Sequence, residues 1–127
     1  MRLMQLGMES FVVGDPTTPA ITENDMLLAV SGSGDTETVY DMVCEAKKKK
    51  AMVWCITAKR NSRIAGRSDK AIIIHGKTKL GKGRSAQPLG SLFEQAALIY
   101  MDSLVVMIME RLGEEEGELR KRHTTLE

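Results

Sequence analysis

The segment MLLAVSGSGDT at positions 26–36 decides the fold. Its first five residues form a short, nearly continuous apolar run, which is typical of a strand covered on both faces of a sheet. A turn rich in glycine and serine follows this run. Beyond the turn, apolar residues return at the i, i+3, i+4 and i+7 spacing of an amphipathic helix: Val39, Met42, Val43 and Ala46. The segment therefore predicts a strand, a tight turn and a helix in direct succession.

Similar apolar runs occur at positions 11–13, 52–56 and 71–74. A strand, a helix and a further strand in this order form a parallel crossover, which is almost always right-handed. We therefore predict an α/β fold with three α/β/α layers and a parallel sheet, of the flavodoxin-like or Rossmann-like kind. In such sheets the ligand lies at the carboxyl ends of the strands, here beside residues 31–36.

The second half of the chain predicts a long helix at positions 92–112. Ser91 and Glu94 fit a capping box at its start, and Gly113 favours a stop at its end. Glu94 and Asp102 make a membrane span costly, so the pattern predicts a buried helix instead. Because the helix is apolar around most of its circumference, one sheet cannot cover it, and we expect a subunit partner to do so.

The segments beside this helix predict little regular structure. Residues 61–66 fit one short helical turn, and residues 76–87 lack periodicity, which indicates a mobile loop. Residues 114–127 predict a polar tail.

Composition narrows the class of protein. The length of 127 residues suits a single domain over 1–127, and the net charge of +1 favours neither a nucleic-acid nor a membrane partner. Cys44 and Cys55 lack the spacing of a zinc site and fit free thiols in a reducing compartment. No secretory signal opens the sequence, so we expect a cytoplasmic protein.

Residues 31–36, SGSGDT, fit an anion cradle between strand and helix. Glycines expose backbone amides, the hydroxyls of Ser31, Ser33 and Thr36 add donors, and the helix N-terminus adds positive potential. A dinucleotide fingerprint would need a third glycine where Glu37 stands, and a P-loop would need Gly-Lys-Ser/Thr at its end. A capped structural turn without a ligand remains the alternative.

This hexapeptide resembles the phosphate loop of SIS (sugar isomerase) domains. Further stretches resemble 6-phospho-3-hexuloisomerases of that family: GDPTTPAI at 14–21, QPLGSLFEQ at 87–95 and RHTTLE at 122–127. The resemblance covers essentially the whole chain and implies that the substrate phosphate is bound by Ser31, Gly32, Ser33, Gly34 and Thr36.

One departure from the family concerns the opening of the chain. Members usually begin with a helix, a strand and a Gly-Arg-Ser-Gly loop, whereas residues 1–7 here resemble the end of the helix that follows this loop. The resemblance therefore implies an N-terminally truncated SIS domain.

The resemblance implies an isomerase of the ribulose monophosphate pathway. It would interconvert 3-hexulose 6-phosphate (arabino-hex-3-ulose 6-phosphate) and fructose 6-phosphate through an enediolate, as a homo-oligomer (dimer or tetramer), without cofactor or metal. The catalytic residues would be Glu94, as the carbon base, and His123, as the proton shuttle or ring partner, with the assignment between them open. The rival function is a non-catalytic sugar-phosphate-binding module or an inactive shortened relative. From the residues alone, Glu94 also fits a helix cap and His123 a solvated surface residue.

Overall fold

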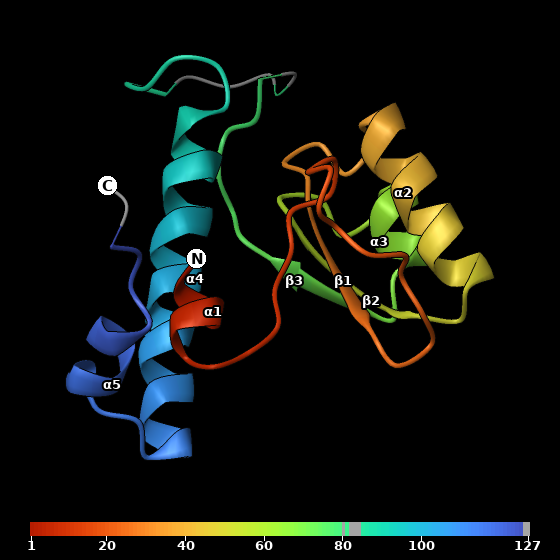
Figure 1. Cartoon of the computed structure of the whole chain (residues 1–127). Coiled ribbons are helices and arrows are strands. Elements are labelled where there is room, and N and C mark those ends of the chain that lie inside the picture. The colour runs from red at the N-terminus through yellow and green to blue at the C-terminus, as the bar shows by residue number, and fades with distance from the viewer. Residues whose placement is uncertain (80, 82–84, 126–127) are drawn as a thin grey trace. The chain divides into compact units, whose positions relative to one another are not determined.

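The computed structural model of the chain describes residues 1–79, 81 and 85–125 (Figure 1). Its elements follow the order α1 (Arg2–Gln5), β1 (Met26–Val30), α2 (Glu37–Lys48), β2 (Met52–Thr57), α3 (Arg63–Arg67), β3 (Lys70–Ile73), α4 (Ser91–Leu112) and α5 (Glu116–Lys121).

The three strands form one parallel sheet in the order β1-β2-β3. Met26 pairs with Met52 at the start of β1 and β2, and Trp54 pairs with Lys70 where β3 begins. The predicted strands at 26–30, 52–56 and 71–74 are confirmed to within one residue at each end.

The predicted strand at 11–13 is wrong, since these residues are irregular in the structure. Phe11, Val12 and Val13 are each more than half exposed, and the amide of Asp15 donates to the Val12 carbonyl in a turn. A short apolar run becomes a strand only when a neighbouring strand takes up its amides and carbonyls. None of the strands in the described residues pairs with this run.

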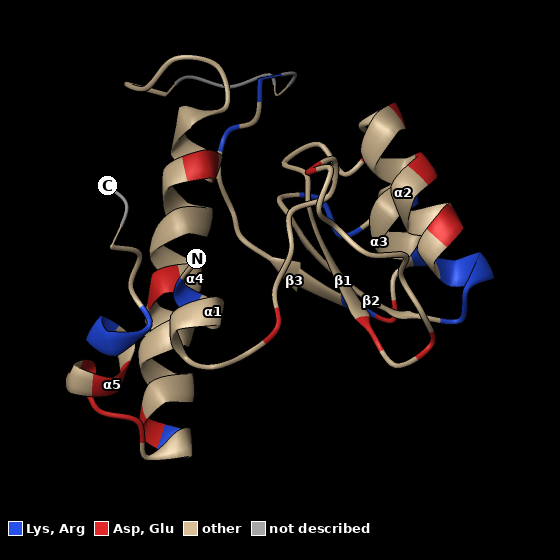
Figure 2. Ribbon diagram, viewed as in Figure 1, with Lys and Arg blue, Asp and Glu red and all other residues tan. Residues whose placement is uncertain are grey.

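α2 and α3 lie together on one side of the sheet (Figure 1). The apolar stripe predicted for α2 supplies Val43 and Ala46 to a core that includes Val53, Cys55 and Ile64. Acidic residues lie along α2 and basic residues gather at its C-terminal end, where cations stabilise the helix dipole (Figure 2). The predicted turn at 61–66 is the short helix α3.

Asp69 joins α2 to the sheet. Its carboxylate accepts from Lys47 Nζ at 2.7 and 2.8 Å and from the Val53 amide at 2.7 Å. The Asp69 amide in turn donates to the Val53 carbonyl at 2.8 Å. The hydrogen bond from Lys47, and after it that from Val53, lowers the pKa of Asp69 below its ordinary value.

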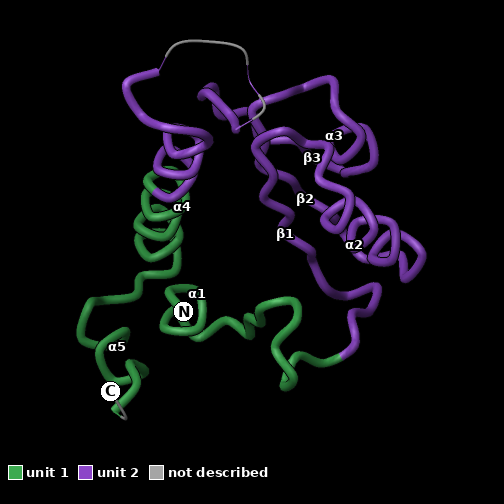
Figure 3. Tube along the Cα trace, turned by 90° about the horizontal axis from the view of Figure 1, so that it is seen from above, with its two compact units in different colours: residues 1–19, 99–127 green, residues 20–98 purple. Residues whose placement is uncertain are grey.

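The chain separates into two compact units, unit 1 with residues 1–19 and 99–127 and unit 2 with residues 20–98 (Figure 3). Unit 2 holds the sheet, α2, α3 and the start of α4. In unit 1, Arg2 Nε is 2.7 Å from Asp102 Oδ1, and Arg122 bonds both the Gln5 carbonyl and Glu114. A single domain over 1–127 stays a prediction.

The ends of α4 follow from backbone hydrogen bonds. Its first helical bond runs from the Glu94 amide to the Gly90 carbonyl, so Ser91 lies inside the helix and donates to Pro88. The predicted capping box is therefore wrong, because Ser91 is one residue too late to cap. The predicted stop at Gly113 is confirmed: its φ is +67°, and the Glu114 amide bonds the Met109 carbonyl, as in a Schellman motif.

The apolar surface of α4 is largely uncovered. Phe93 and Ala97 are its buried residues, whereas Ile99 is 67% and Met107 is 64% exposed. The prediction of a buried helix is wrong for the single chain, because the described residues hold too few apolar partners for a helix that is apolar on most sides. By length and composition α4 could also span a membrane.

Two further expectations concern the remaining segments. The predicted tail at 114–127 contains a short helix, α5, with an ion pair between Glu116 and Arg120 one turn apart. In the predicted loop at 76–87, the described residues form no helix or strand, and positions 80 and 82–84 lie outside the described residues.

Candidate functional site

The serine-rich loop, residues 31–36, connects the carboxyl end of β1 to the start of α2. Gly34 has a φ of +68°, and a Cβ there would lie 2.1 Å from Ser62 Oγ and 2.9 Å from Thr57 Oγ1. The Ile64 amide donates to the Gly34 carbonyl at 2.9 Å. Only glycine can both adopt this conformation and let the segment after β2 approach so closely.

Three hydroxyls of this loop form a chain. Ser31 Oγ lies 2.9 Å and Ser33 Oγ 3.4 Å from Thr36 Oγ1, and both serines are more than nine-tenths buried. Three hydroxyls carry three protons, and their two mutual hydrogen bonds use two of them. At least one hydroxyl proton is therefore left for a ligand.

Backbone amides add further donors. The amides of Gly34 and Asp35 bond Ser31 Oγ and Ser33 Oγ. No described residue accepts from the amides of Gly32 and Ser33, or from the first-turn amides of α2, which have no partner within their own helix. Thr36, the N-cap residue, makes no side-chain cap bond. The loop thus keeps the donors that an anion requires.

A pocket of about 230 Å³ opens beside this loop. It is lined by Val30, Ser31, Gly32, Ser33, Thr36, Val39, Thr78, Lys79, Gly90, Phe93 and Glu94. The structure therefore brings the predicted base Glu94 together with four of the five predicted phosphate-binding residues. The fifth, Gly34, does not line the pocket and acts through the backbone.

Two glycines allow α4 to reach the loop. A Cβ on Gly32 would lie 2.9 Å from Phe93 Cδ1, and a Cβ on Gly76 would lie 3.0 Å from Phe93 Cα. Phe93 itself is buried. This close packing brings the neighbouring residue Glu94 to the pocket, where its Oε1 would be 2.9 Å from a Cβ on Gly90.

Arg63 secures the helix that begins at the loop. Its guanidinium bonds the Glu37 carboxylate at 2.6 and 3.1 Å and lies 4.0 Å from the Tyr40 ring centroid, and its amide donates to Asp35. The hydrogen bond and the charge of Arg63 lower the pKa of Glu37. The segment after β2 thereby holds the start of α2 in position.

Sequence reasoning missed two polar residues of the pocket, Thr78 and Lys79. Both positions fell within residues 76–87, for which the sequence predicted only a loop. Both residues lie in an aperiodic stretch just beyond β3. Their position just beyond β3 is the signal that could have identified them as site residues, because segments that leave parallel strands at the carboxyl end surround the ligand site.

His123 lies in unit 1, just after α5. Its Nδ1 is 3.1 Å from the Thr124 carbonyl oxygen. The structure does not place it relative to the pocket, so its catalytic role stays a prediction.

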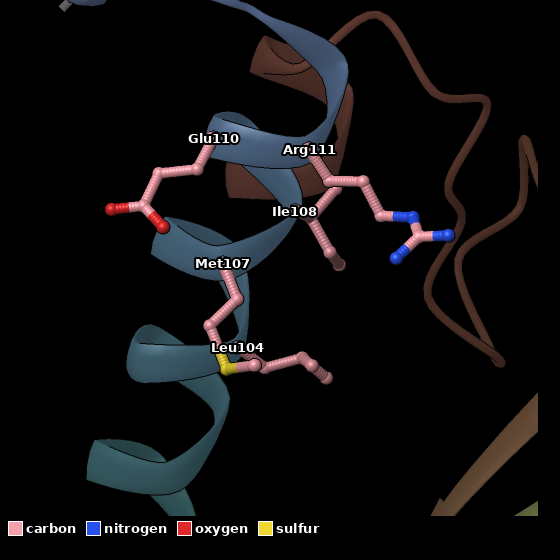
Figure 4. A pocket seen from close by; sticks show the side chains of 5 residues that line it. All are labelled: Leu104, Met107, Ile108, Glu110 and Arg111. Carbon is pink, nitrogen blue, oxygen red and sulfur yellow. The ribbon is translucent and has the colours of Figure 1, made fainter.

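A larger hollow of about 450 Å³ lies on the part of α4 that belongs to unit 1. The side chains of Leu104, Met107, Ile108, Glu110 and Arg111 line it, and all come from this one helix (Figure 4). Glu110 and Arg111 point away from each other in this view, so no polar groups converge as they would at a reaction centre. The smaller pocket is therefore the candidate site.

Known proteins resemble this chain over its whole length. A 3-hexulose-6-phosphate isomerase of Mycobacterium gastri is 40% identical over 129 residues, which cover all of this chain and 65% of that protein. The Bacillus subtilis protein of the same name is 33% identical over 130 residues, which cover all of this chain and 70% of that protein.

A solved structure agrees with this likeness. A hypothetical protein of Methanococcus jannaschii, whose structure infers a function of 3-hexulose-6-phosphate isomerase, has a TM-score of 0.90 and 35% identity. The match covers 99% of this chain and 68% of that one. The SIS-type α/β fold predicted from the sequence is confirmed. Since the SIS domain model also matches residues 11–101, the chain belongs to the SIS domain family.

Proposed function

We propose that this protein is an isomerase that interconverts 3-hexulose 6-phosphate and fructose 6-phosphate. Relatives that are 33%, 40% and 36% identical carry the name of this enzyme. The observation that carries the proposal is that the pocket places Glu94 beside Ser31, Ser33 and Thr36. A carboxylate base and an anion cradle thus share one small cavity.

The serine-rich loop binds the phosphate of the sugar. Ser31, Ser33 and Thr36 supply hydroxyls, Gly32 supplies an amide, and Gly34 allows the turn that aims them. A phosphate ester accepts several charge-assisted hydrogen bonds, which are stronger than neutral ones. Binding there fixes the sugar so that its reacting carbons lie near a catalytic group.

Glu94 acts as the base at carbon. It removes the proton from C2 of the 3-ketose, which gives an enediolate across C2 and C3. Returning the proton to C3 and moving the hydroxyl proton from O2 to O3 leaves the carbonyl at C2, as in fructose 6-phosphate. No atom is gained or lost, and no external oxidant enters. The Glu94 carboxylate forms no ion pair with a described residue, which suits a group that must exchange a proton.

His123 is proposed as the proton shuttle between O2 and O3. The resemblance to hexuloisomerases supports this role. A His123→Gln variant should then lose turnover while the affinity for fructose 6-phosphate changes little.

The test of the function is turnover by wild type and by Glu94→Gln. The wild-type chain should form fructose 6-phosphate from 3-hexulose 6-phosphate in a coupled assay. Glu94→Gln should lose about 100-fold or more in kcat, the usual effect of removing a general base, and still bind fructose 6-phosphate. Glu110→Gln, on the same helix and outside the pocket, is the matched control and should retain activity. Equal turnover by wild type and Glu94→Gln would contradict the assignment of the base.

A sugar-phosphate-binding module without turnover is the second candidate. One observation favours it: the serine-rich loop, which is proposed to bind the phosphate, lies within residues 20–98, whereas His123, the proposed proton shuttle, belongs to the other unit. The unit of residues 20–98 thus contains the elements for binding but not both catalytic residues. Tight binding of fructose 6-phosphate by a wild-type chain that shows no isomerisation would identify this function.

The wider setting is proposed on the same basis. We expect a cytoplasmic homo-oligomer, a dimer or tetramer, that works in the ribulose monophosphate pathway without cofactor, nucleic acid or membrane. The exposed apolar surface of α4 supports association between copies.

A further inference from the structure

Lys79 is the cation that lines the candidate pocket. Among the eleven lining residues, Lys79 and Glu94 are the two that carry a charge. No ion pair joins either of them to a described residue. The ammonium group of Lys79 is therefore available to a ligand.

The charges of the proposed substrate create a need for such a cation. A phosphate ester carries between about one and a half and two negative charges at neutral pH. The donors of the serine-rich loop are neutral, and Glu94 adds a carboxylate to a cavity of about 230 Å³. Like charges confined together repel each other, which weakens binding of the phosphate. A cation in the same cavity offsets this repulsion.

The backbone of Lys79 is held against the site. The Lys79 amide nitrogen would lie 3.5 Å from a Cβ on Gly90, and the same Cβ would lie 2.9 Å from Glu94 Oε1. Its neighbour Thr78 is 6% exposed, and Thr78 Cγ2 would lie 3.1 Å from a Cβ on Gly32. Thr78 and Lys79 thus pack against the serine-rich loop and the start of α4. The backbone of Lys79 is held in place, and its exposed side chain extends from there.

We propose that Lys79 is a substrate-binding residue that contacts the phosphate of the sugar together with the serine-rich loop and makes the pocket select phosphorylated over neutral sugars. The inference deepens the proposed function and rests on it for the identity of the sugar. Lys79 acts on binding, through its charge, and the proton transfers remain with other residues.

Calorimetric titration of the full chain tests this role with fructose 6-phosphate, inorganic phosphate and fructose. Lys79→Gln should weaken binding of the two phosphate compounds about 10- to 100-fold, the usual effect of losing one charged hydrogen bond. Fructose should bind the variant and the wild type equally. Lys79→Arg keeps the charge and should restore binding to within a few-fold. Raising the salt concentration should weaken wild-type binding more than that of Lys79→Gln.

Lys77→Gln is the matched control, because Lys77 belongs to the same segment and does not line the pocket. It should bind like wild type, and thermal melts of all variants should coincide. Unchanged affinity of Lys79→Gln for fructose 6-phosphate would overturn the inference, and so would a wild-type chain that binds no phosphate compound. Phosphate binding that depends on Lys79, in a chain that does not isomerise the hexulose, would instead overturn the proposed function and leave the inference standing.

Discussion

At the residue scale, Gly90 separates Glu94 from the segment that carries Lys79. A Cβ at this position would lie 2.9 Å from Glu94 Oε1 and 3.5 Å from the Lys79 amide nitrogen. The first of these neighbours is the end of a flexible side chain, which can move aside. The absence of a side chain at Gly90 therefore determines the position of the Glu94 carboxylate and has little influence on whether the chain folds.

Gly90→Ala should lower turnover while the fold persists. The added methyl displaces the Glu94 carboxylate, and misplacing a catalytic group by about 1 Å can cost about 100-fold in rate. Because Gly90 caps α4, stability should fall by about 1 kcal/mol or less. Steady-state kinetics and thermal melts measure the two effects. Gly66→Ala is the control, since a Cβ there meets nothing within 4 Å, and it should leave kcat unchanged.

At the element scale, the sequence predicts correctly those helices and strands whose own residues carry the pattern that forms them. The apolar run 26–30 and the helical stripe from Val39 to Ala46 lie on a strand and a helix as predicted. Residues 11–13 have the same local pattern, but no strand of the described residues pairs with them, so their structure depends on residues elsewhere. Of the site, the sequence and its resemblance predicted Glu94 and the serine-rich loop. Lys79 was missed because a residue in an aperiodic segment acquires its role only from the helix that packs against it.

Asp69 provides a test of how the elements are joined. Asp69→Asn removes the ion pair with Lys47 and weakens the bond to Val53, so the melting temperature should fall at neutral pH. The folded state lowers the pKa of Asp69, so its contribution is fully present above the ordinary value of 3.8 and is lost as the pH falls through the lower, folded pKa. Melting curves from pH 7 to pH 2 should converge for wild type and variant at the acid end. Asp41→Asn, an exposed residue of α2, should show no such difference; a constant difference at every pH would contradict the assigned cause.

At the scale of the whole molecule, α4 presents more apolar surface than one chain covers. Ile99, Val106 and Met107 are each more than half exposed, and the hollow in Figure 4 is formed by the same helix. Large exposed apolar patches are typical of interaction sites, which supports the proposed association between copies. The chain spans 65–71% of the length of its relatives. The association proposed here is that of the 127-residue chain itself.

Light scattering coupled to size exclusion should show a dimer or tetramer. Met107→Glu should shift the chain toward monomer, because burying an unpaired carboxylate in an apolar contact is costly. Ser103→Glu places the same charge at an exposed polar position of α4 and serves as the comparison. A wild-type chain that elutes as a monomer at all concentrations would refute the proposed association.

The hydroxyl chain of Ser31, Thr36 and Ser33 has a consequence for a reaction that runs in both directions. Each of its two bonds can be reversed by rotating both hydroxyls that it joins, and the unused proton then resides on a different oxygen while every heavy atom stays in place. The loop can thus re-aim its donor at low cost. Because the phosphate is common to the two ketoses of the proposed reaction, we expect one rigid cradle to hold it throughout, with the hydroxyl protons alone adapting to shifts of its oxygens.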